Sequence, residues 1–285
     1  MKIVKFLGGL GNQLFQYAFY LGLEENFTTV KSDLTDFRTY KLHNGFELEK
    51  IFGVKLRKAH NFEIKLHDTT DRRWIWRKLR RIAGTKNAYH QESKPFAYDA
   101  SIFKNKKNKY YWGYWQHIDY INLIEEKLRA RLTFPKFTDT QNLKLIERMK
   151  QHETVAIHVR RGDYLSEPLF KNICDKAYYK RSINYINEHV ESPLYLFFSD
   201  DIEWCRKTFS TLQAFYVDWN KGEDSFRDMQ LISLCNHVII SNSTFSWWGA
   251  WLNDREKKIV VAPQKWKNDP FVNSDALLLK SFIRL

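Results

Sequence analysis

Apolar and polar positions divide the chain into short apolar runs and longer amphipathic segments, which predict alternating strands and helices. Residues 2–7 (KIVKFL) have the pattern of a buried strand, and residues 13–26 place apolar side chains at helical spacing. Further strands are predicted at residues 27–34 and from residue 110 onward. Residues 121–134 have the pattern of an amphipathic helix that ends before a proline.

A second series of alternating elements starts with a helix at residues 140–151. Its strands are predicted at residues 154–159, 193–201, 213–219, 237–243 and 258–263. Its helices are predicted at residues 176–190, 201–209, 225–235 and 244–253. Strands and helices that alternate in this way predict a parallel sheet with right-handed crossovers. We therefore expect an α/β fold with two doubly wound halves facing a cleft, and domains at residues 1–140 and 141–285.

The composition indicates a globular protein and excludes a disordered one. The 285 residues are 44% hydrophobic and 16% aromatic, which is enough apolar surface for a large core. The formal net charge of +13 should attract nucleic acid, anionic lipid or a phosphorylated substrate. Charge alone does not choose among these partners.

Cysteine usage and the first residues indicate a reducing, cytoplasmic location. Cys174, Cys205 and Cys235 form no CxxC pair and no even-numbered framework. The chain opens with a strand-like run, and no stretch of about 18 apolar residues follows. Peripheral contact with the inner face of a membrane is compatible with this pattern.

Polar clusters fall where the predicted strands end. They are GGLGN after the first strand and, in the second half, HVRRGDY, FSDD, DWNKGEDS and SNSTFSWW. In an open parallel sheet, ligands bind outside the carboxyl ends of the strands. The placement of these clusters therefore predicts a binding site.

The cluster GGLGN resembles a dinucleotide-binding turn, but the fingerprint is incomplete. Gly9 and Gly11 open the predicted helix, whereas Leu14 stands where a third glycine is expected. Asp33 lies about twenty residues further on, where that fingerprint places its ribose-binding acid. The alternative is a tight strand-to-helix turn that needs glycine for a positive φ.

The paired arginines of HVRRGDY predict an anion site, because a guanidinium binds phosphate oxygens through parallel charge-assisted hydrogen bonds. Arg160 and Arg161 point to opposite sides if the strand continues, so one can meet a ligand while the other anchors the loop. The acids available for that anchor are Asp163, Asp200 and Asp201. The alternatives are a solvated arginine pair and, for His158, a packed core histidine.

Hydroxyl and amide side chains collect in SNSTFSWW, where a strand ends and a helix begins. The set includes Asn242, Ser243, Thr244 and Ser246. With the helix dipole they would bind an anion, and N-capping by Ser243 or Thr244 is compatible with that role. Trp247, Trp248 and Trp251 are expected in the core rather than as a sugar platform.

The acidic residues do not predict a metal site. The chain has no D-x-D triplet of the kind that metal-dependent nucleotide-sugar enzymes usually carry. Arginine and helix termini are expected to take the place of the ion. Asp200 and Asp201 also fit a capping role on the helix that follows them.

Residues 71–84 (DRRWIWRKLRRIAG) interleave basic side chains with tryptophan, leucine and isoleucine. As a helix this segment is basic and amphipathic, which is typical of an interfacial membrane segment. An ordinary surface helix is the alternative.

Four of these stretches together resemble the α-1,2-fucosyltransferases of glycosyltransferase family 11. They are GGLGNQLFQYA, HVRRGDY, FSDD and SNSTFSWWGAWL, in that order over nearly the whole chain. The resemblance implies a GT-B type fold with two Rossmann-like halves and transfer of L-fucose from GDP-β-L-fucose to the 2-hydroxyl of a galactoside. It also implies inversion, no metal ion and no cofactor besides the donor substrate.

The same resemblance implies roles for individual residues. Arg160 would bind the β-phosphate and stabilise the charge on departing GDP, Arg161 would brace the loop, and His158 would contact the nucleotide. Asp228 would meet the guanine edge. The other residues expected at the nucleotide or the cleft are Gly11, Asn12, Gln13, Asn242, Ser243 and Thr244.

The general base departs from the family pattern. Inversion by direct displacement needs a group that takes the proton of the acceptor hydroxyl. Distantly related fucosyltransferases use a carboxylate beyond the arginine motif, at an offset where this chain has Pro168. Asp163 and Glu167 are the nearby candidates, and a transition state with oxocarbenium character needs only partial proton removal.

The predicted partners follow from this resemblance. Residues 1–140 would bind the acceptor, a galactoside of a surface glycan that can be lipid-linked, and residues 141–285 would bind GDP-fucose. Nucleic acid is not expected, and residues 71–84 would supply any membrane contact. The alternatives are a basic Rossmann-type dinucleotide-dependent enzyme and a polyanion-binding protein that uses the net charge.

Overall fold

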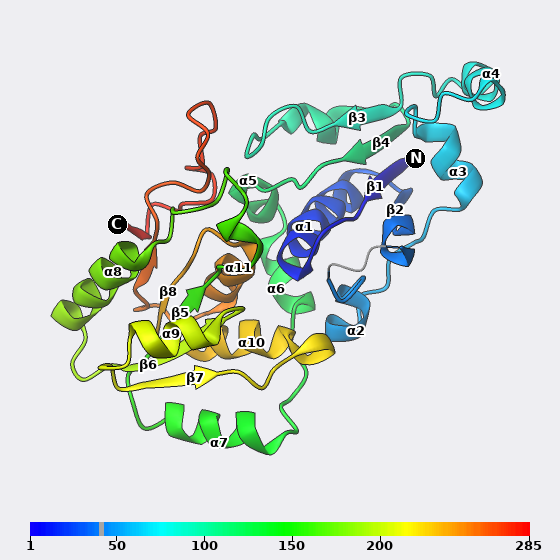
Figure 1. Cartoon of the computed structure of the whole chain (residues 1–285). Coiled ribbons are helices and arrows are strands. Elements are labelled where there is room, and N and C mark those ends of the chain that lie inside the picture. The colour runs from blue at the N-terminus through cyan, green and yellow to red at the C-terminus, as the bar shows by residue number, and fades with distance from the viewer. Residues whose placement is uncertain (40–42) are drawn as a thin grey trace. The chain divides into compact units, whose positions relative to one another are not determined.

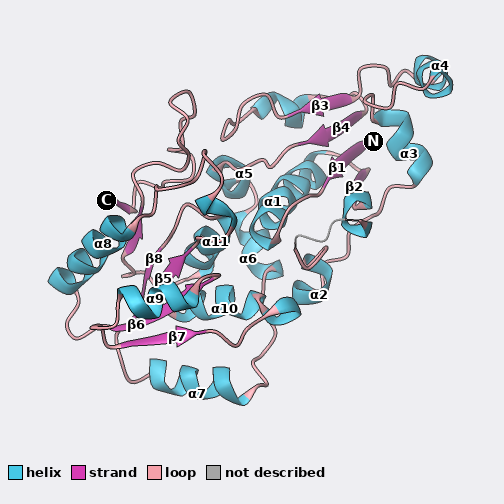
Figure 2. Cartoon of the chain, in the orientation of Figure 1, coloured by secondary structure: helices cyan, strands magenta, loops and turns pink. Residues whose placement is uncertain are grey.

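Two parallel β-sheets organise the chain, one in each of two units that comprise Met1–Thr133 (unit 1) and Phe134–Leu285 (unit 2) (Figure 1). The coordinates are a computed structural model that describes residues 1–39 and 43–285. In both units strands alternate with helices along the chain, as the sequence predicts (Figure 2).

The described part of unit 1 has a sheet with strand order β2-β1-β4-β3, in which all neighbouring strands are parallel. Its strands are β1 (Lys2–Lys5), β2 (Val30–Asp33), β3 (Tyr89–Gln91) and β4 (Lys109–Trp112). Ile3 and Val4 of the central strand β1 are fully buried, as expected for a parallel strand covered on both faces. Strand β3 was not predicted, because three residues are too short to show a hydrophobic period.

The helices described in unit 1 include one long, deeply buried element. They are α1 (Leu10–Asn26), α2 (Leu48–Phe52), α3 (Asn61–His67), α4 (Trp74–Ile82), α5 (Ile118–Asn122) and α6 (Glu125–Arg131). Phe19 of α1 is fully buried and stacks on Trp115, with ring centroids 4.1 Å apart. The single helix predicted at residues 121–134 is wrong: Ile124 has a φ of −139° and a buried side chain, so packing separates α5 from α6.

Unit 2 contains a six-stranded parallel sheet with the order β10-β9-β8-β5-β6-β7. Its strands are β5 (Thr154–Val159), β6 (Leu194–Ser199), β7 (Ala214–Val217), β8 (His237–Ile239), β9 (Val260–Ala262) and β10 (Ile283–Arg284). The chain builds outward from β5 in one direction and then from β8 in the other. This doubly wound order places a topological switch point between β5 and β8, where such folds bind ligands.

Helices cover both faces of the unit 2 sheet. They are α7 (Thr140–Met149), α8 (Lys176–His189), α9 (Ile202–Thr208), α10 (Phe226–Leu234) and α11 (Thr244–Leu252). Val155 and Ile157 of β5 pack in one core cluster with Tyr178 and Tyr179 of α8. On the opposite face of β5, His158 stacks on Phe245 of α11, since neighbouring strand residues point to opposite sides.

The tryptophans of α11 belong to this core. Trp247 and Trp248 are fully buried and Trp251 is 6% exposed, which confirms the prediction that they are core residues. No helix within residues 1–39 and 43–285 is long and apolar enough to cross a bilayer.

Candidate functional site

The polar clusters predicted at strand ends lie at the carboxyl ends of the parallel strands. HVRRGDY overlaps the end of β5, FSDD the end of β6, DWNKGEDS follows β7 and SNSTFSWW follows β8. β5 pairs with β6 on one side and with β8 on the other. His158 near the end of β5, and the loops that carry the two arginines and Ser243, therefore lie at the switch point of unit 2.

Arg160 follows the last residue of β5 and is held by two carboxylates. Its Nη2 lies 2.8 Å from Asp163 Oδ1, and its Nη1 lies 3.2 Å from Asp200 Oδ2. The side chain remains 31% exposed. Because a guanidinium has five N–H donors, these two contacts leave others that can meet an anionic ligand.

Arg161 turns to a different set of partners. Its Nε lies 3.0 Å from Asp201 Oδ2, and its guanidinium carbon lies 4.2 Å from the ring centroid of Trp204. Asp201 also accepts a hydrogen bond from the Trp204 N–H as the N-cap of α9. We expected one of the two arginines to be anchored by an acid, and the structure pairs both.

Gly162 lies against the Asp200 side chain. A Cβ at position 162 would lie 2.7 Å from Asp200 Oδ2. Asp200 Oδ1 in addition accepts a hydrogen bond from the Arg161 N–H at 2.9 Å. The pair Asp200 and Asp201, which follows β6, therefore fixes the arginine loop that follows β5.

His158 is buried beside Arg160 and stays neutral. Its Nδ1 lies 2.9 Å from Ser241 Oγ, and its ring stacks on Phe245. Burial, and secondarily the Arg160 charge, lowers the pKa of His158 to about 3. The imidazole can therefore exchange hydrogen bonds at neutral pH but carries no charge to bind phosphate.

The loop after β8 is fixed by its own side chains. Asn242 is buried, and its amide donates to the carbonyl of Trp266 at 3.2 Å. Ser243 is the N-cap of α11 and accepts from the Phe245 N–H, which confirms the capping prediction for that residue. Thr244, the first residue of α11, is partly exposed.

Tyr164, the last residue of HVRRGDY, joins the β5 and β8 loops and was not singled out from the sequence. Its hydroxyl donates to the Asn242 carbonyl at 3.3 Å, and its ring stacks on Phe170 with centroids 4.7 Å apart. The Arg160 guanidinium lies 5.6 Å from the same ring. Only its place at the end of HVRRGDY, three residues after Arg161, could have indicated this role.

Asp228 belongs to a separate polar network at the start of α10. Asn220 donates to Asp228 Oδ1 at 2.8 Å, and Asn142 of α7 donates to the Asn220 amide oxygen at 2.7 Å. Burial raises the pKa of Asp228 to about 7, against the opposing effect of the Asn220 hydrogen bond. Among the hydrogen bonds and ion pairs of the described residues, none joins Asp228 to Arg160.

The two candidate bases lie on the β5 loop in different surroundings. Asp163 is exposed, and its carboxylate is paired with Arg160. Glu167 is exposed, and its Oε1 accepts from the Leu169 N–H at 3.4 Å. Neither carboxylate is buried, so either is accessible to a proton donor from solvent or substrate.

Gly11, Asn12 and Gln13 lie in unit 1, in the first turn of α1 after the turn at Gly8. Gly8 has a φ of +80°, which confirms that this turn needs glycine in the left-handed region. Asn12 Oδ1 accepts from the Gln116 side chain at 2.8 Å. The fully buried Gln13 amide donates to the carbonyls of Gly8 and Gly45 and accepts from the Glu47 N–H, so backbone groups already occupy it.

The acid of the incomplete dinucleotide fingerprint also has internal partners. Asp33 is buried, with Oδ2 accepting from the Tyr110 hydroxyl at 2.7 Å and Oδ1 accepting from Thr35. A ribose would have to displace these bonds. The geometry therefore favours the structural interpretation of the first glycine turn.

Metal ligands do not cluster in the part of the chain that the structure describes: no group of three or more His, Cys, Asp or Glu side chains is arranged to hold an ion. The described residues at the unit 2 switch point instead offer guanidinium groups, the N-terminus of α11 and a neutral imidazole. Such donors suit the phosphates and base of a nucleotide.

Comparison with known proteins identifies relatives over most of the chain. The family model described as Glycosyl transferase family 11 matches residues 3–285. An Escherichia coli protein named alpha-1,2-colitosyltransferase is 32% identical over 278 residues, which cover 95% of this chain and 94% of that protein. A Gorilla gorilla gorilla protein named galactoside alpha-(1,2)-fucosyltransferase 1 is 24% identical over 257 residues, which cover 86% of this chain and 63% of that protein.

A solved structure shares the fold. The fucosyltransferase NodZ from Bradyrhizobium aligns with a TM-score of 0.51 at 14% identity, over 88% of this chain and 91% of that one. Together with the two parallel sheets, this likeness confirms the predicted GT-B type α/β fold with two Rossmann-like halves.

Proposed function

Because this chain belongs to glycosyl transferase family 11, we propose that it transfers L-fucose from GDP-β-L-fucose to the 2-hydroxyl of a galactoside in a surface glycan, with inversion and without a metal ion. The names of two relatives support the linkage, since both specify α-1,2 transfer and one specifies a galactoside acceptor. The donor and the stereochemistry are our own extension.

The observation that carries the proposal is the position of Arg160. It follows the central strand of a doubly wound sheet at the switch point, with donors to spare beyond its two carboxylate contacts. In the proposed complex these donors hold the β-phosphate of GDP. The guanidinium then stabilises the negative charge that builds on the leaving diphosphate, which is a transition-state effect.

The proposed reaction forms one carbon–oxygen bond and breaks another, with transfer of one proton. The acceptor 2-hydroxyl oxygen attacks the anomeric carbon of fucose, and the bond from that carbon to the β-phosphate oxygen breaks. GDP leaves with the bonding electrons, and the hydroxyl proton passes to a base. Attack opposite the leaving group converts the β-linked donor into an α-linked product.

Asp163 fits the role of the base through its contact with Arg160. Three acids, Asp163, Asp200 and Asp201, surround two arginines in the described loop, and Asp163 is the most exposed of the three at 57%. A phosphate bound to Arg160 would compete with Asp163 and release its carboxylate beside the donor. Glu167 is the alternative base, and Asp163→Asn and Glu167→Gln distinguish them, because only loss of the base should lower turnover of GDP-fucose while GDP affinity is kept.

The remaining contacts to the nucleotide are proposed as follows. Neutral His158 contacts the nucleotide through the imidazole nitrogen that does not face Ser241, and Arg161 positions the loop through Asp201. Ser243 and Thr244 present hydroxyl and helix N-terminal groups near the diphosphate, and the buried Asn242 holds their loop through the Trp266 carbonyl. Asp228 accepts hydrogen bonds from the guanine edge once it is ionised.

The acceptor is proposed to contact unit 1, where Gly11, Asn12 and Gln13 begin α1. Asn12, whose Oδ1 accepts from the Gln116 side chain, would hold the start of α1 beside the sugar. Gln13 would act by holding the Gly8 turn, because its amide is buried among backbone partners.

GDP-colitose is the second candidate donor. The relative aligned over 94% of its length is named an alpha-1,2-colitosyltransferase. Colitose lacks the 3-hydroxyl that L-fucose carries. A site built to hydrogen-bond that hydroxyl would reject the colitosyl donor by about 10⁴-fold, whereas a site without such a contact would accept both.

The test is GDP release from purified protein with GDP-fucose, GDP-colitose or GDP-mannose and a soluble β-galactoside, with and without EDTA. We expect EDTA-resistant turnover of GDP-fucose and an α-1,2 linkage in the product. If only GDP-colitose is turned over, GDP-colitose and not GDP-fucose is the donor. Loss of turnover in EDTA would contradict the metal-independent mechanism.

A further inference from the structure

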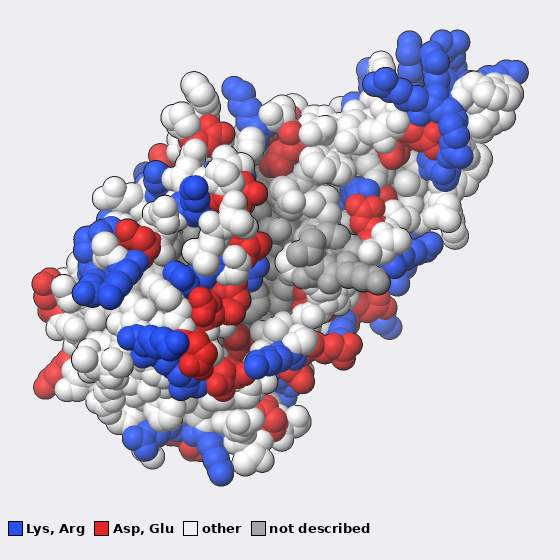
Figure 3. All heavy atoms as spheres, viewed as in Figure 1, with Lys and Arg blue, Asp and Glu red and all other residues white. Residues whose placement is uncertain are grey.

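The segment from Asp68 to Lys86, here called the α4 segment, concentrates basic side chains on unit 1. Figure 3 shows Lys and Arg gathered over α4. The basic residues are Arg72, Arg73, Arg77, Lys78, Arg80, Arg81 and Lys86, and the acids are Asp68 and Asp71. Their contacts divide them into two groups with different functions.

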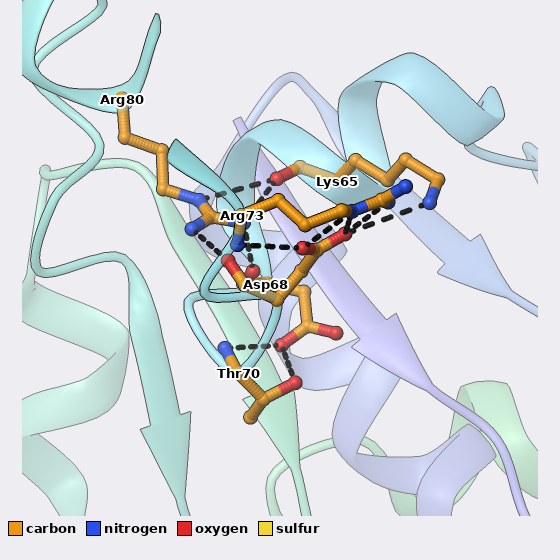
Figure 4. Close-up of polar contacts among 6 residues, drawn as sticks. Lys65, Asp68, Thr70, Arg73 and Arg80 are labelled. Atoms are coloured by element: carbon orange, nitrogen blue, oxygen red, sulfur yellow. Dashed lines mark hydrogen bonds and ion pairs between the residues drawn. The ribbon is translucent and has the colours of Figure 1, made fainter. Parts of the chain in front are cut away.

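Arg80 and Arg73 fix the shape of the segment (Figure 4). Arg80 is only 3% exposed, and its guanidinium donates to the backbone carbonyls of Lys65, Asp68 and Asp71. Arg73 Nε donates to Asp71 Oδ1 at 3.0 Å, and this pairing lowers the pKa of Asp71. The loop before α4 is therefore wrapped around a buried cation, which holds α4 in place against α3.

The other basic residues have no such partners. Within residues 1–39 and 43–285, Arg72, Arg77, Lys78, Arg81 and Lys86 make no ion pair. A pocket of about 400 Å³ is lined by Thr69, Arg72, Arg77, Arg80, Arg81 and Lys86. No carboxylate lines this pocket, so its potential is positive and suits an anion.

Large apolar side chains are exposed on the same helix. Trp74 is 72% exposed, Ile75 44% and Ile82 76%. Ile75 and Ile82 are separated by seven residues and so share one side of α4, whereas Trp76 packs on Phe62 of α3. A small soluble anion in the pocket would leave these side chains in water.

We propose that the α4 segment docks on an anionic lipid bilayer, with Trp74, Ile75 and Ile82 in the headgroup–acyl boundary and a lipid phosphate in the arginine pocket. A basic, amphipathic helix with an exposed tryptophan has the surface that interfacial binding requires. The unpaired cations complement the negative potential of anionic lipid. This inference goes beyond the proposed function and does not depend on which sugar is transferred.

Co-sedimentation of the full chain with vesicles tests the proposal. One set of vesicles contains phosphatidylcholine alone, and the other also contains about one third phosphatidylglycerol. We expect binding to the anionic vesicles and weak binding to the neutral ones. Arg77→Glu/Arg81→Glu and Trp74→Ser/Ile82→Ser should each lower the partition coefficient by on the order of tenfold or more.

Matched control variants separate docking from net charge and from general hydrophobicity. Lys144→Glu/Lys180→Glu makes the same change in charge at exposed sites on α7 and α8, and Phe271→Ser removes an exposed phenylalanine elsewhere. Both controls should sediment like wild type. Equal loss in a control and in its α4 counterpart would overturn the proposal.

Two further arms distinguish the source of the anion. Inorganic phosphate or a short RNA duplex that binds the wild type as tightly as anionic vesicles do, with no effect of Trp74→Ser/Ile82→Ser, would also overturn lipid docking. Turnover of a soluble galactoside acceptor should be unchanged in both α4 variants. Failure of vesicle binding with intact turnover would therefore reject this inference while leaving the proposed function in place.

Discussion

The arginine loop after β5 and the α4 segment are both rich in arginine, but their guanidinium groups have different partners. In the loop, Arg160 and Arg161 are each held by carboxylates at 2.8–3.2 Å. In the α4 segment, the buried Arg80 contacts backbone carbonyls, and Arg77 and Arg81 make no ion pair with any residue that the structure describes.

This difference indicates what each region is built to bind. Carboxylate partners fix the orientation of a guanidinium. They also cancel much of its charge, so the pair attracts distant anions only weakly. Unpaired cations beside exposed apolar side chains attract a charged surface without selecting one orientation of a small ligand. The first arrangement suits one diphosphate in one geometry, and the second suits a lipid surface.

The largest expected effect is the loss of turnover when Arg160 is replaced. Arg160→Ala should lower the rate of GDP release from GDP-fucose by on the order of a hundredfold to a thousandfold, because it removes charge stabilisation that is strongest in the transition state. Arg77→Glu/Arg81→Glu should leave turnover of a soluble acceptor unchanged. Steady-state kinetics on both variants measure this, and near-wild-type turnover of Arg160→Ala would remove Arg160 from the mechanism.

A smaller effect is expected when the carboxylate support is displaced. In Gly162→Ala the new Cβ would lie 2.7 Å from Asp200 Oδ2, so Asp200 must move away from Arg160 and from the Arg161 N–H. We expect kcat/KM to fall by about tenfold, since the guanidinium loses its orientation. Asp200→Asn, which removes the charge from the same side chain without adding a Cβ, should give a comparable loss, and wild-type kinetics in both variants would show that orientation by Asp200 is unimportant.

The pH dependence of binding should differ between the two regions. Burial raises the pKa of Asp228 to about 7, so only as the pH rises through that value would both of its oxygens be free to accept from guanine in the proposed complex. GDP affinity should therefore increase by roughly fivefold between about pH 6 and about pH 8 in wild type. Asp228→Asn should reduce this dependence, and vesicle binding should not share it because arginine does not titrate in this range.

The same shift affects folding in the opposite direction. The pKa of Asp228 is higher in the folded state than in the unfolded chain, so the folded state binds this proton more tightly. The stability that the protonated group contributes is therefore present at low pH and is lost as the pH rises through about 7. Denaturant unfolding of wild type and Asp228→Asn across this range checks the sign. A difference between the two that grows in favour of wild type with rising pH would contradict the assignment.

Salt should produce the smallest change at the arginine loop. Raising the ionic strength from about 0.05 M to about 0.5 M should weaken vesicle binding by about tenfold or more, and GDP binding by only about threefold. The reason is that carboxylates already neutralise the partly buried Arg160 and Arg161, whereas the exposed cations of α4 are open to screening. Equal salt sensitivity of the two would remove the distinction drawn here.

Local pattern predicted much of this organisation. Continuous apolar runs identified β5 and β6, and polar clusters after them marked the carboxyl ends at which the candidate site lies. The basic period of residues 71–84 predicted α4, because an exposed amphipathic helix shows its pattern without tertiary context. The sequence predicted an acidic anchor for one arginine among Asp163, Asp200 and Asp201, and Arg161 pairs with Asp201.

Contacts between distant segments could not be predicted in the same way. The contact of His158 with Ser241 and the chain from Asp228 through Asn220 to Asn142 join residues that only the strand order brings together. The break between α5 and α6 depends on the burial of Ile124, which a helical period does not reveal. Pairing of both arginines likewise required the positions of Asp163 and Asp200 in space.

The measurement that tests the central claim most directly is calorimetric titration of GDP into wild type, Arg160→Ala and Arg77→Glu/Arg81→Glu. The account predicts that GDP binds wild type and the α4 variant with equal affinity. It predicts that Arg160→Ala weakens binding by about tenfold to a hundredfold, the loss expected for a charge-assisted hydrogen bond. Unchanged affinity in Arg160→Ala, or loss of affinity in the α4 variant, would contradict it.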